Sequence, residues 1–366
     1  MGDITKKVTI SKDFLPTLSV CMIVKNEENN LKRLLPLLDG IVDELIIVDT
    51  GSSDGTKDIA LQYTSNFHYF EWCDDFSAAR NESLKYATKD YILWLDADDI
   101  ISKQDIARLK LHIKKYPNTG VFVTLVDKRP TKEFQSIQLR AFPNIDGIKF
   151  VGKVHEQVSF SIEQVGLKYS HCAIVITHLG YDSEEAVIKK LERNIRILEK
   201  ELSENSNDFL YNLHLAKTYL GVGHVDKAVP YSKKALELVK DVEISKENAF
   251  MAYMTECTIL SLQGKTNEAV FLMEKAKELF PDNKILQLTL AEMYFRRKDY
   301  KKAYKELLFI KTSTLGIGLI PIDAKDMSKA MMQLLITSAL HIGDFETAEF
   351  CLGKIYNDPD YTIYRG

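Results

Sequence analysis

The chain has few of the features that mark secreted, disulfide-bonded or membrane-spanning proteins. Its 366 residues include five scattered cysteines, and no Cys-x-x-Cys pair joins any two of them. Such a set argues against a disulfide framework or a zinc site and favours a reducing compartment. The first residues lack the apolar core of a signal peptide, and no apolar run approaches the roughly 18 residues of a membrane-spanning helix. We therefore expect a cytoplasmic protein without integral membrane contact.

A strong charge of one sign is also missing. Lys and Arg number 48 against 52 Asp and Glu, for a net charge of −4, so there is no electrostatic reason to expect nucleic acid as a partner. The glycine spacings GxGxxG and GxxxxGK[ST] are absent, which argues against a dinucleotide fold or a P-loop. The composition is that of an ordinary soluble protein, and the length suffices for two domains.

Short apolar runs alternate with helical patterns in the first half of the chain. The runs that predict buried strands are 18–24, 44–48, 66–72 and 91–95, and the segments with helical spacing are 28–38, 56–63 and 77–88. Strands that alternate with helices predict an α/β domain with a mostly parallel, Rossmann-like sheet. The stretch 121–178 is rich in β-forming residues and predicts some antiparallel pairing at the end of this domain.

The second half is helical and self-similar. Small residues recur at matching places in three units, namely Ala216, Ala228, Ala235, Ala269, Ala276, Ala291 and Ala303. The distance from Ala269 to Ala303 is 34 residues, which is the period of tetratricopeptide repeats, in which paired helices stack on one another. We predict an α/β domain over 1–182, a connecting helix over 183–207 and all-α tetratricopeptide-like repeats over 208–366.

The most informative stretch is 91–99, YILWLDADD, in which an apolar run ends in Asp96, Asp98 and Asp99. Ligands of open α/β sheets bind at the carboxyl ends of the strands, and hard divalent cations prefer oxygen ligands. An Asp-x-Asp pair at such a strand end therefore predicts a metal site beside a phosphate-bearing ligand. The alternative is an acidic turn that caps a helix beginning at Ile101.

Three motifs in order resemble the N-terminal half of family 2 glycosyltransferases. They are LSVCMIVKNEENNL, ELIIVDTGSSDGT and WLDADD, and the resemblance covers about residues 17–180. It implies a GT-A fold, which binds a nucleotide sugar and a metal through an Asp-x-Asp motif. The segments EWCDDFSAARN, KFVGKVHEQV and ITHLGY, joined to the repeats, are similar to a bacterial subgroup, the glycocin peptide S- and O-glycosyltransferases such as the sublancin enzyme.

The resemblance implies a role for particular residues. Asp49 would bind the nucleobase, Asp96 would approach the ribose or a metal-bound water, and Asp98 and His178 would ligate the metal. The remaining positions implied to bind the nucleotide sugar are Asn26, Glu27, Arg80 and Lys153. Glu156 would be the general base. The implied cofactors are Mg²⁺ or Mn²⁺, and the implied donor is a nucleotide sugar, with UDP as the expected nucleotide.

Two assignments keep an alternative. His155 is adjacent to Glu156, and on a strand the two side chains would face opposite ways, so that one of them serves as base. Arg80 could pair with Asp74 or Asp75 at a helix N-terminus instead of meeting the diphosphate.

The resulting expectation is a cytoplasmic bacterial enzyme, an inverting glycosyltransferase that moves a hexose or N-acetylhexosamine to Cys, Ser or Thr of a peptide or protein. The repeats would bind the acceptor or form a homodimer. One alternative is transfer to a cell-surface polysaccharide or lipid-linked glycan. Another is a repeat scaffold whose first domain no longer catalyses.

Overall fold

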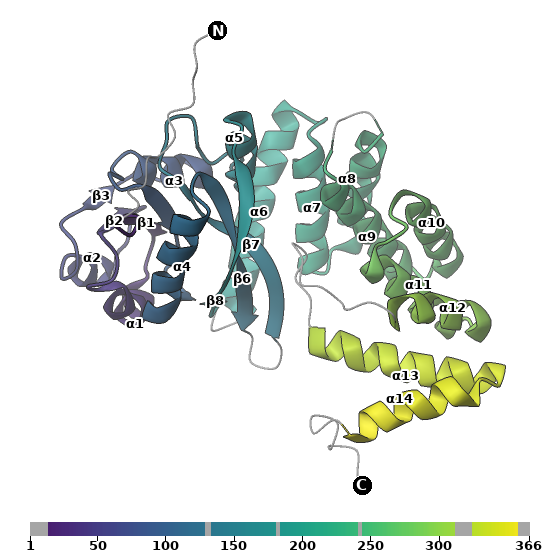
Figure 1. Ribbon diagram of the computed structural model, residues 1–366. Coiled ribbons are helices and arrows are strands. Elements are labelled where there is room, and N and C mark those ends of the chain that lie inside the picture. Colours follow the sequence, from purple (N-terminus) through teal and green to yellow (C-terminus); the bar gives the residue numbers. More distant parts are fainter. Residues whose placement is uncertain (1–13, 129–132, 181–183, 241–243, 312–323, 358–366) are drawn as a thin grey trace. The chain divides into compact units, whose positions relative to one another are not determined.

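The computed structural model describes residues 14–128, 133–180, 184–240, 244–311 and 324–357 (Figure 1). The chain forms two compact units that divide between Glu184 and Glu185. The first unit contains all the strands described, and the second is helical. The predicted domain limits stay a prediction.

The first unit is built on one eight-stranded sheet with the order β3-β2-β1-β4-β7-β6-β8-β5. The strands are β1 (Leu18–Val24), β2 (Glu44–Asp49), β3 (Phe67–Tyr69), β4 (Tyr91–Trp94), β5 (Asp99–Ile100), β6 (Thr119–Lys128), β7 (Glu133–Pro143) and β8 (Lys168–His178). Strands β1 to β4 pair in parallel, whereas β7 runs antiparallel to both β4 and β6. The mostly parallel α/β sheet with added antiparallel strands is therefore confirmed.

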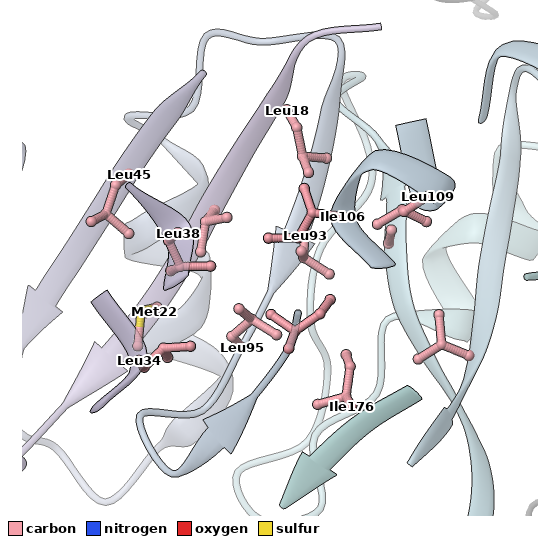
Figure 2. Close-up of a cluster of buried hydrophobic side chains, with 14 of the residues drawn as sticks. Leu18, Met22, Leu34, Leu38, Leu45, Leu93, Leu95, Ile106, Leu109 and Ile176 are labelled. Atoms are coloured by element: carbon pink, nitrogen blue, oxygen red, sulfur yellow. The ribbon is translucent and has the colours of Figure 1, made fainter. Parts of the chain in front are cut away.

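Helices cover both faces of this sheet. They are α1 (Glu28–Leu38), α2 (Thr56–Ala60), α3 (Phe76–Leu84), α4 (Lys103–Lys115) and α5 (Ser159–Gln164). Because β1 is buried on both faces, its side chains alternate between two cores. Val20 and Met22 pack with α1 and α4, whereas Cys21 packs on the opposite side with Ile162 of α5. Figure 2 shows part of the first of these cores.

The differences from the predicted elements are small. Some elements are shorter than predicted, and two short elements were not predicted. The predicted strand 66–72 is reduced to β3, and the helix predicted over 56–63 ends at Ala60. Both β5 and α5 were missed, because two strand residues and six helix residues carry too little periodicity to be recognised. The helix expected from Ile101 begins at Lys103, and its cap is Ser102, whose side chain accepts from the backbone N–H of Asp105.

The second unit is a row of helices. They are α6 (Glu184–Glu204), α7 (Phe209–Gly221), α8 (Val225–Leu238), α9 (Lys246–Leu262), α10 (Thr266–Leu279), α11 (Lys284–Arg296), α12 (Tyr300–Lys311), α13 (Ala324–Ile342) and α14 (Phe345–Asn357). Consecutive helices pack as pairs, α7 with α8, α9 with α10, α11 with α12 and α13 with α14. The seven alanines of the predicted repeat are all fully buried.

Helix α6 makes the same contact as a repeat helix. The Tyr294 hydroxyl of α11 donates to Glu274 of α10, 20 residues earlier, at 2.5 Å. The Tyr219 hydroxyl of α7 donates to Glu199 of α6, again 20 residues earlier. Leu191 of α6 also lies against Gly221 at the end of α7. We infer that α6, predicted as a connecting helix, takes the place of the second helix of a preceding repeat.

All five cysteines are free thiols, four of them buried. Within the described ranges, every helix is too short or too polar to cross a lipid bilayer.

Candidate active site

The acidic turn after β4 meets the end of β8. Strand β5 pairs antiparallel with β8, and in this register Asp99 lies opposite His178. The backbone N–H of Leu179 also donates to the carbonyl of Asp98 at 3.0 Å. As a result, Asp96, Asp98, Asp99 and His178 each offer one ligand atom, and these atoms lie within 4.8 Å of one another. We call these four residues the acidic cluster.

Asp98 is the carboxylate whose protonation the site perturbs most clearly. Burial, together with the charges of Asp96, Asp99 and Glu27, raises its pKa to about 7 against the opposing effect of His178. Burial lowers the pKa of His178, but the hydrogen bond to Asp99 and the carboxylates around it outweigh burial, so that its pKa is raised overall. The crowding of negative charge around Asp98 would be relieved by a bound cation.

Asp96 is held by two arginines. Its Oδ1 pairs with Nη2 of Arg80 at 2.7 Å, and its Oδ2 lies 3.5 Å from Nη1 of Arg140. Burial alone would raise its pKa, but the two guanidinium charges reverse this effect and hold the pKa well below its usual range. Asp96 is therefore a fixed negative charge whose partners are already inside the protein.

Trp94, the last residue of β4, lies beneath both arginines. The guanidinium carbons of Arg80 and Arg140 lie 4.4 Å and 3.9 Å from its ring centroid. The indole N–H donates to the carbonyl of Leu139 at 2.9 Å, which fixes the ring in the sheet. A stacked aromatic face favours cations in a buried setting, so Trp94 helps to hold two positive charges close together.

Arg80 also binds the predicted base. Its Nε donates to Oε1 of Glu156 at 2.6 Å, while its Nη2 binds Asp96, and the Arg80 side chain is 8% exposed. Of the two alternative partners of Arg80, Asp75 accepts from the N–H of Ala78 at the start of α3, and Asp74 accepts from the indole N–H of Trp72. One buried guanidinium thus joins Glu156 to the acidic turn.

Glu156 lies on a short loop, and the assumption that it lies on a strand is wrong. An isolated antiparallel bridge between Val151 and Gln157 closes the loop, and Gly152 and His155 within it adopt positive φ angles of 102° and 58°. The alternating orientation of a strand therefore does not apply. His155 is exposed, whereas the Glu156 side chain is 12% exposed and faces Arg80.

The predicted nucleobase residue lies at the end of β2. Asp49 is 7% exposed, and its carboxylate accepts from the N–H groups of Gly51 and Ser52 at 3.2 Å and 3.1 Å and from the Ser52 hydroxyl. The same hydroxyl accepts from the N–H of Asn26 at 2.9 Å. The loops after β1 and β2 are therefore joined around Asp49.

Glu27 lies between these loops and the acidic cluster. Its N–H donates to the Thr56 hydroxyl at 2.7 Å, and its carboxylate raises the pKa of Asp98. Burial raises the pKa of Glu27 itself, and the charge of Asp96 adds to this effect.

The carbonyl of Lys153 accepts from the N–H of Phe76 at 2.9 Å, so the loop that carries Glu156 is attached to the start of α3.

Two residues that organise this site were missed from the sequence. Asp99 belongs to the acidic turn that was considered as a helix cap, but it caps no described helix and is fully buried between His178 and Arg140. Arg140 was overlooked inside the apolar strand run SIQLRAF, although a lone arginine in such a run is itself a signal of a buried charge partner.

The chemistry of the cluster suits a divalent cation. Three carboxylates and one imidazole supply hard oxygen donors and one nitrogen, a set that Mn²⁺ and Mg²⁺ accept, with Mn²⁺ more tolerant of the imidazole. Asp98 and His178, which were predicted as the ligands, both belong to the cluster.

Comparison with known proteins identifies two regions of the chain. The model of the family "Glycosyl transferase family 2" matches residues 19–179, and a model of YpiA-like tetratricopeptide repeats matches residues 269–313. A TPR repeat-containing protein of Synechococcus elongatus is 31% identical over 60% of this chain and 56% of its own length. The glycosyltransferase SunS of Bacillus subtilis is 27% identical over 68% of this chain and 60% of its own length.

Among solved structures, residues 1–349 of S. aureus TarS are 14% identical to this chain with a TM-score of 0.39, over 82% of this chain and 93% of that one. The matches to the two curated relatives span less than two thirds of the length of either protein. The family match runs from Ser19 in β1 to Leu179 directly after β8, and it includes every residue of the acidic cluster. The first unit of this chain therefore belongs to glycosyl transferase family 2, and a tetratricopeptide-repeat region follows it.

Proposed function

We propose that the chain is a metal-dependent, inverting glycosyltransferase that moves a hexose or N-acetylhexosamine from a UDP-sugar to a Cys, Ser or Thr side chain of a peptide or protein. One observation carries the proposal. The buried guanidinium of Arg80 contacts two carboxylates at once. Its Nε lies 2.6 Å from Oε1 of Glu156, and its Nη2 lies 2.7 Å from Oδ1 of Asp96 in the acidic turn. The proposal assigns Glu156 as the base and the acidic turn as the diphosphate site, so that Arg80 would hold the two close together.

In this proposal the donor lies along the sheet edge. Asp49 accepts from the nucleobase, Asn26 and Glu27 flank it, and Lys153 lies near the sugar. Asp98 and His178 would hold the cation. When bound, the cation neutralises the negative charge that develops on the leaving diphosphate.

Glu156 acts on the acceptor. Arg80 holds Oε1, and we assign Oε2 to receive the proton of the acceptor hydroxyl or thiol. The acceptor oxygen or sulfur forms a bond to the anomeric carbon from the face opposite the leaving group. The bond from that carbon to the diphosphate oxygen breaks, and the nucleoside diphosphate leaves with the electron pair. A thiol needs this base less than a hydroxyl does, since part of it is ionised near neutral pH.

The acceptor class rests on the resemblance to the glycocin glycosyltransferases, the relation to SunS and the repeat region. Repeat arrays present extended surfaces to other chains, so we assign the repeats to acceptor binding.

The test is mass spectrometry after incubation with a mixture of UDP-hexoses and UDP-N-acetylhexosamines. Cys-containing and Ser-containing peptides, a polysaccharide and water serve as acceptors, each with and without EDTA. A mass increase of one sugar on a peptide, lost with EDTA and restored by Mn²⁺, is the expected result. Transfer to the polysaccharide alone would replace the peptide assignment. No turnover of any UDP-sugar and no UDP binding would overturn the donor class.

A further inference from the structure

Asp99 differs from the other carboxylates of the acidic cluster in its exposure. Its side chain is 0% exposed, whereas those of Asp96 and Asp98 are 30% and 16% exposed. Its Oδ2 accepts from the N–H of Asp96 at 2.9 Å and from Nη1 of Arg140 at 3.0 Å, and its Oδ1 lies 3.0 Å from Nδ1 of His178. Three protein groups therefore occupy most of the roughly four acceptor positions of the Asp99 carboxylate, which leaves little capacity for a cation.

The arginines divide the three carboxylates into two kinds. Asp99 is paired with Arg140, and Asp96 is paired with Arg80, with Arg140 close by. A divalent cation next to either carboxylate would also lie close to a guanidinium, which repels it. Among the ion pairs of the described residues, Asp98 is paired with His178 and with no arginine. The charge distribution therefore directs a cation to Asp98 and away from Asp99.

The contact with Asp99 also determines which ring nitrogen of neutral His178 carries the proton. A carboxylate is an acceptor, so the nearer approach, 3.0 Å to Asp99 against 3.4 Å to Asp98, requires the proton of the neutral ring on Nδ1. The lone pair is then on Nε2. A histidine that donates one ring N–H to a buried carboxylate while its other nitrogen binds metal is a recurrent arrangement in metal sites.

We propose that Asp99 is a positioning residue of this site and not a metal ligand. It holds Nδ1 of His178 protonated and Nε2 bare, and Arg140, fixed over Trp94 at 3.9 Å, holds Asp99. This inference rests on the metal site of the proposed function, and its first test needs neither metal nor turnover.

The first test measures the tautomer of His178 in the metal-free full chain. Nitrogen-15 spectra distinguish protonated from bare ring nitrogens, and the signals of His178 are those missing from a His178→Gln spectrum. At a pH where the ring is neutral, we expect a proton on Nδ1 in the wild type. In Asp99→Asn this preference should weaken, because an amide can donate to Nδ1 as well as accept from it. A wild-type ring with its proton on Nε2 would overturn the proposal, whether or not the variant folds.

The second test uses Mn²⁺ alone, with free Mn²⁺ followed by electron paramagnetic resonance. Asp99→Asn should weaken binding about 10-fold to 100-fold, as expected for an outer partner of a ligand. Asp58→Asn, which removes an exposed carboxylate from α2, should change nothing. The double variant Asp99→Asn with His178→Gln should bind no more weakly than His178→Gln alone, because Asp99 acts through His178.

The outcomes separate this proposal from the proposed function. Losses that multiply in the double variant would make Asp99 a ligand in its own right and would overturn the positioning role while leaving the metal site intact. Absence of Mn²⁺ binding by the wild type, with UDP-sugar transfer that EDTA does not inhibit, would overturn the metal site and the positioning role together. Non-additive losses with the Nδ1-protonated tautomer would support both.

Discussion

The two units of this chain differ in the kinds of side chain that lie at their characteristic buried positions. In the first unit, buried charged side chains gather at one end of the sheet, where Asp49, Arg80, Asp99 and Arg140 are each at most 7% exposed. In the repeat unit, the periodic buried positions are alanines, which carry no charge and let helices approach. A site needs a few unlike groups at particular places, whereas a repeat needs the same small group many times. Substitutions should therefore impair chemistry in one unit and packing in the other.

The largest effect is expected from Asp98→Asn, which keeps the shape of the side chain and removes its charge. Losing the cation beside the diphosphate should cost several kcal/mol of transition-state stabilisation, or about 10³-fold in the transfer rate. The measurement is initial-rate transfer from a UDP-sugar, with circular dichroism to check folding. Asp58→Asn is the matched control. Activity within a few-fold of wild type in Asp98→Asn would remove Asp98 from the metal site.

The base assignment predicts the next largest effect. Glu156→Gln should slow transfer to a Ser peptide by about 10²–10⁴-fold and slow transfer to a Cys peptide less, since the thiol is more readily ionised. His155→Gln, one residue earlier on the same loop, should stay near the wild-type rate. If His155→Gln were the slow variant and Glu156→Gln the normal one, the base would be His155.

Packing in the repeats predicts a change in stability rather than in chemistry. Ala269→Leu places a larger side chain at a fully buried position and should lower the free energy of unfolding by about 1–3 kcal/mol. Its neighbour Glu268 is exposed, so Glu268→Leu introduces the same side chain as a control with little effect. Denaturant unfolding followed by circular dichroism measures both. Equal stability of the two variants would contradict the close helix approach at Ala269.

The smallest effects test whether α6 belongs to the repeat array. Tyr294→Phe and Tyr219→Phe each remove a hydroxyl that donates to a glutamate 20 residues earlier. Each should cost about 0.5–1.5 kcal/mol of stability in the same unfolding measurement. A cost for Tyr294→Phe with none for Tyr219→Phe would return α6 to the role of a connecting helix.

Much of the fold could be predicted from local pattern. The strand β1 and the helix α1 have the bounds that their apolar spacing predicts. The alanines of the predicted repeat are buried in the helices of the second unit. The acidic cluster brings together two predicted ligands, Asp98 and His178. Patterns of this kind repeat over a few residues, so a single sequence shows them directly.

The partners within the site could not be predicted in the same way. Arg80 and Glu156 are 76 residues apart, and Asp99 and His178 are 79 apart. Two-residue strands such as β5 give no periodic signal, yet the pairing of β5 with β8 is what places Asp99 opposite His178. The positive φ angles at Gly152 and His155 likewise turn a stretch that looked like a strand into a loop.

The sequence by itself determined the α/β unit, the repeat unit and the acidic turn at a strand end, because each depends on residues close together in the chain. Only the tertiary structure decided the partners and the burial of each carboxylate. Asp99 is fully buried and paired with Arg140, and Asp96 is paired with Arg80. The pKa of Asp98 is raised to about 7. The difference is electrostatic, since three neighbouring aspartates are alike in sequence until distant charges approach them unequally.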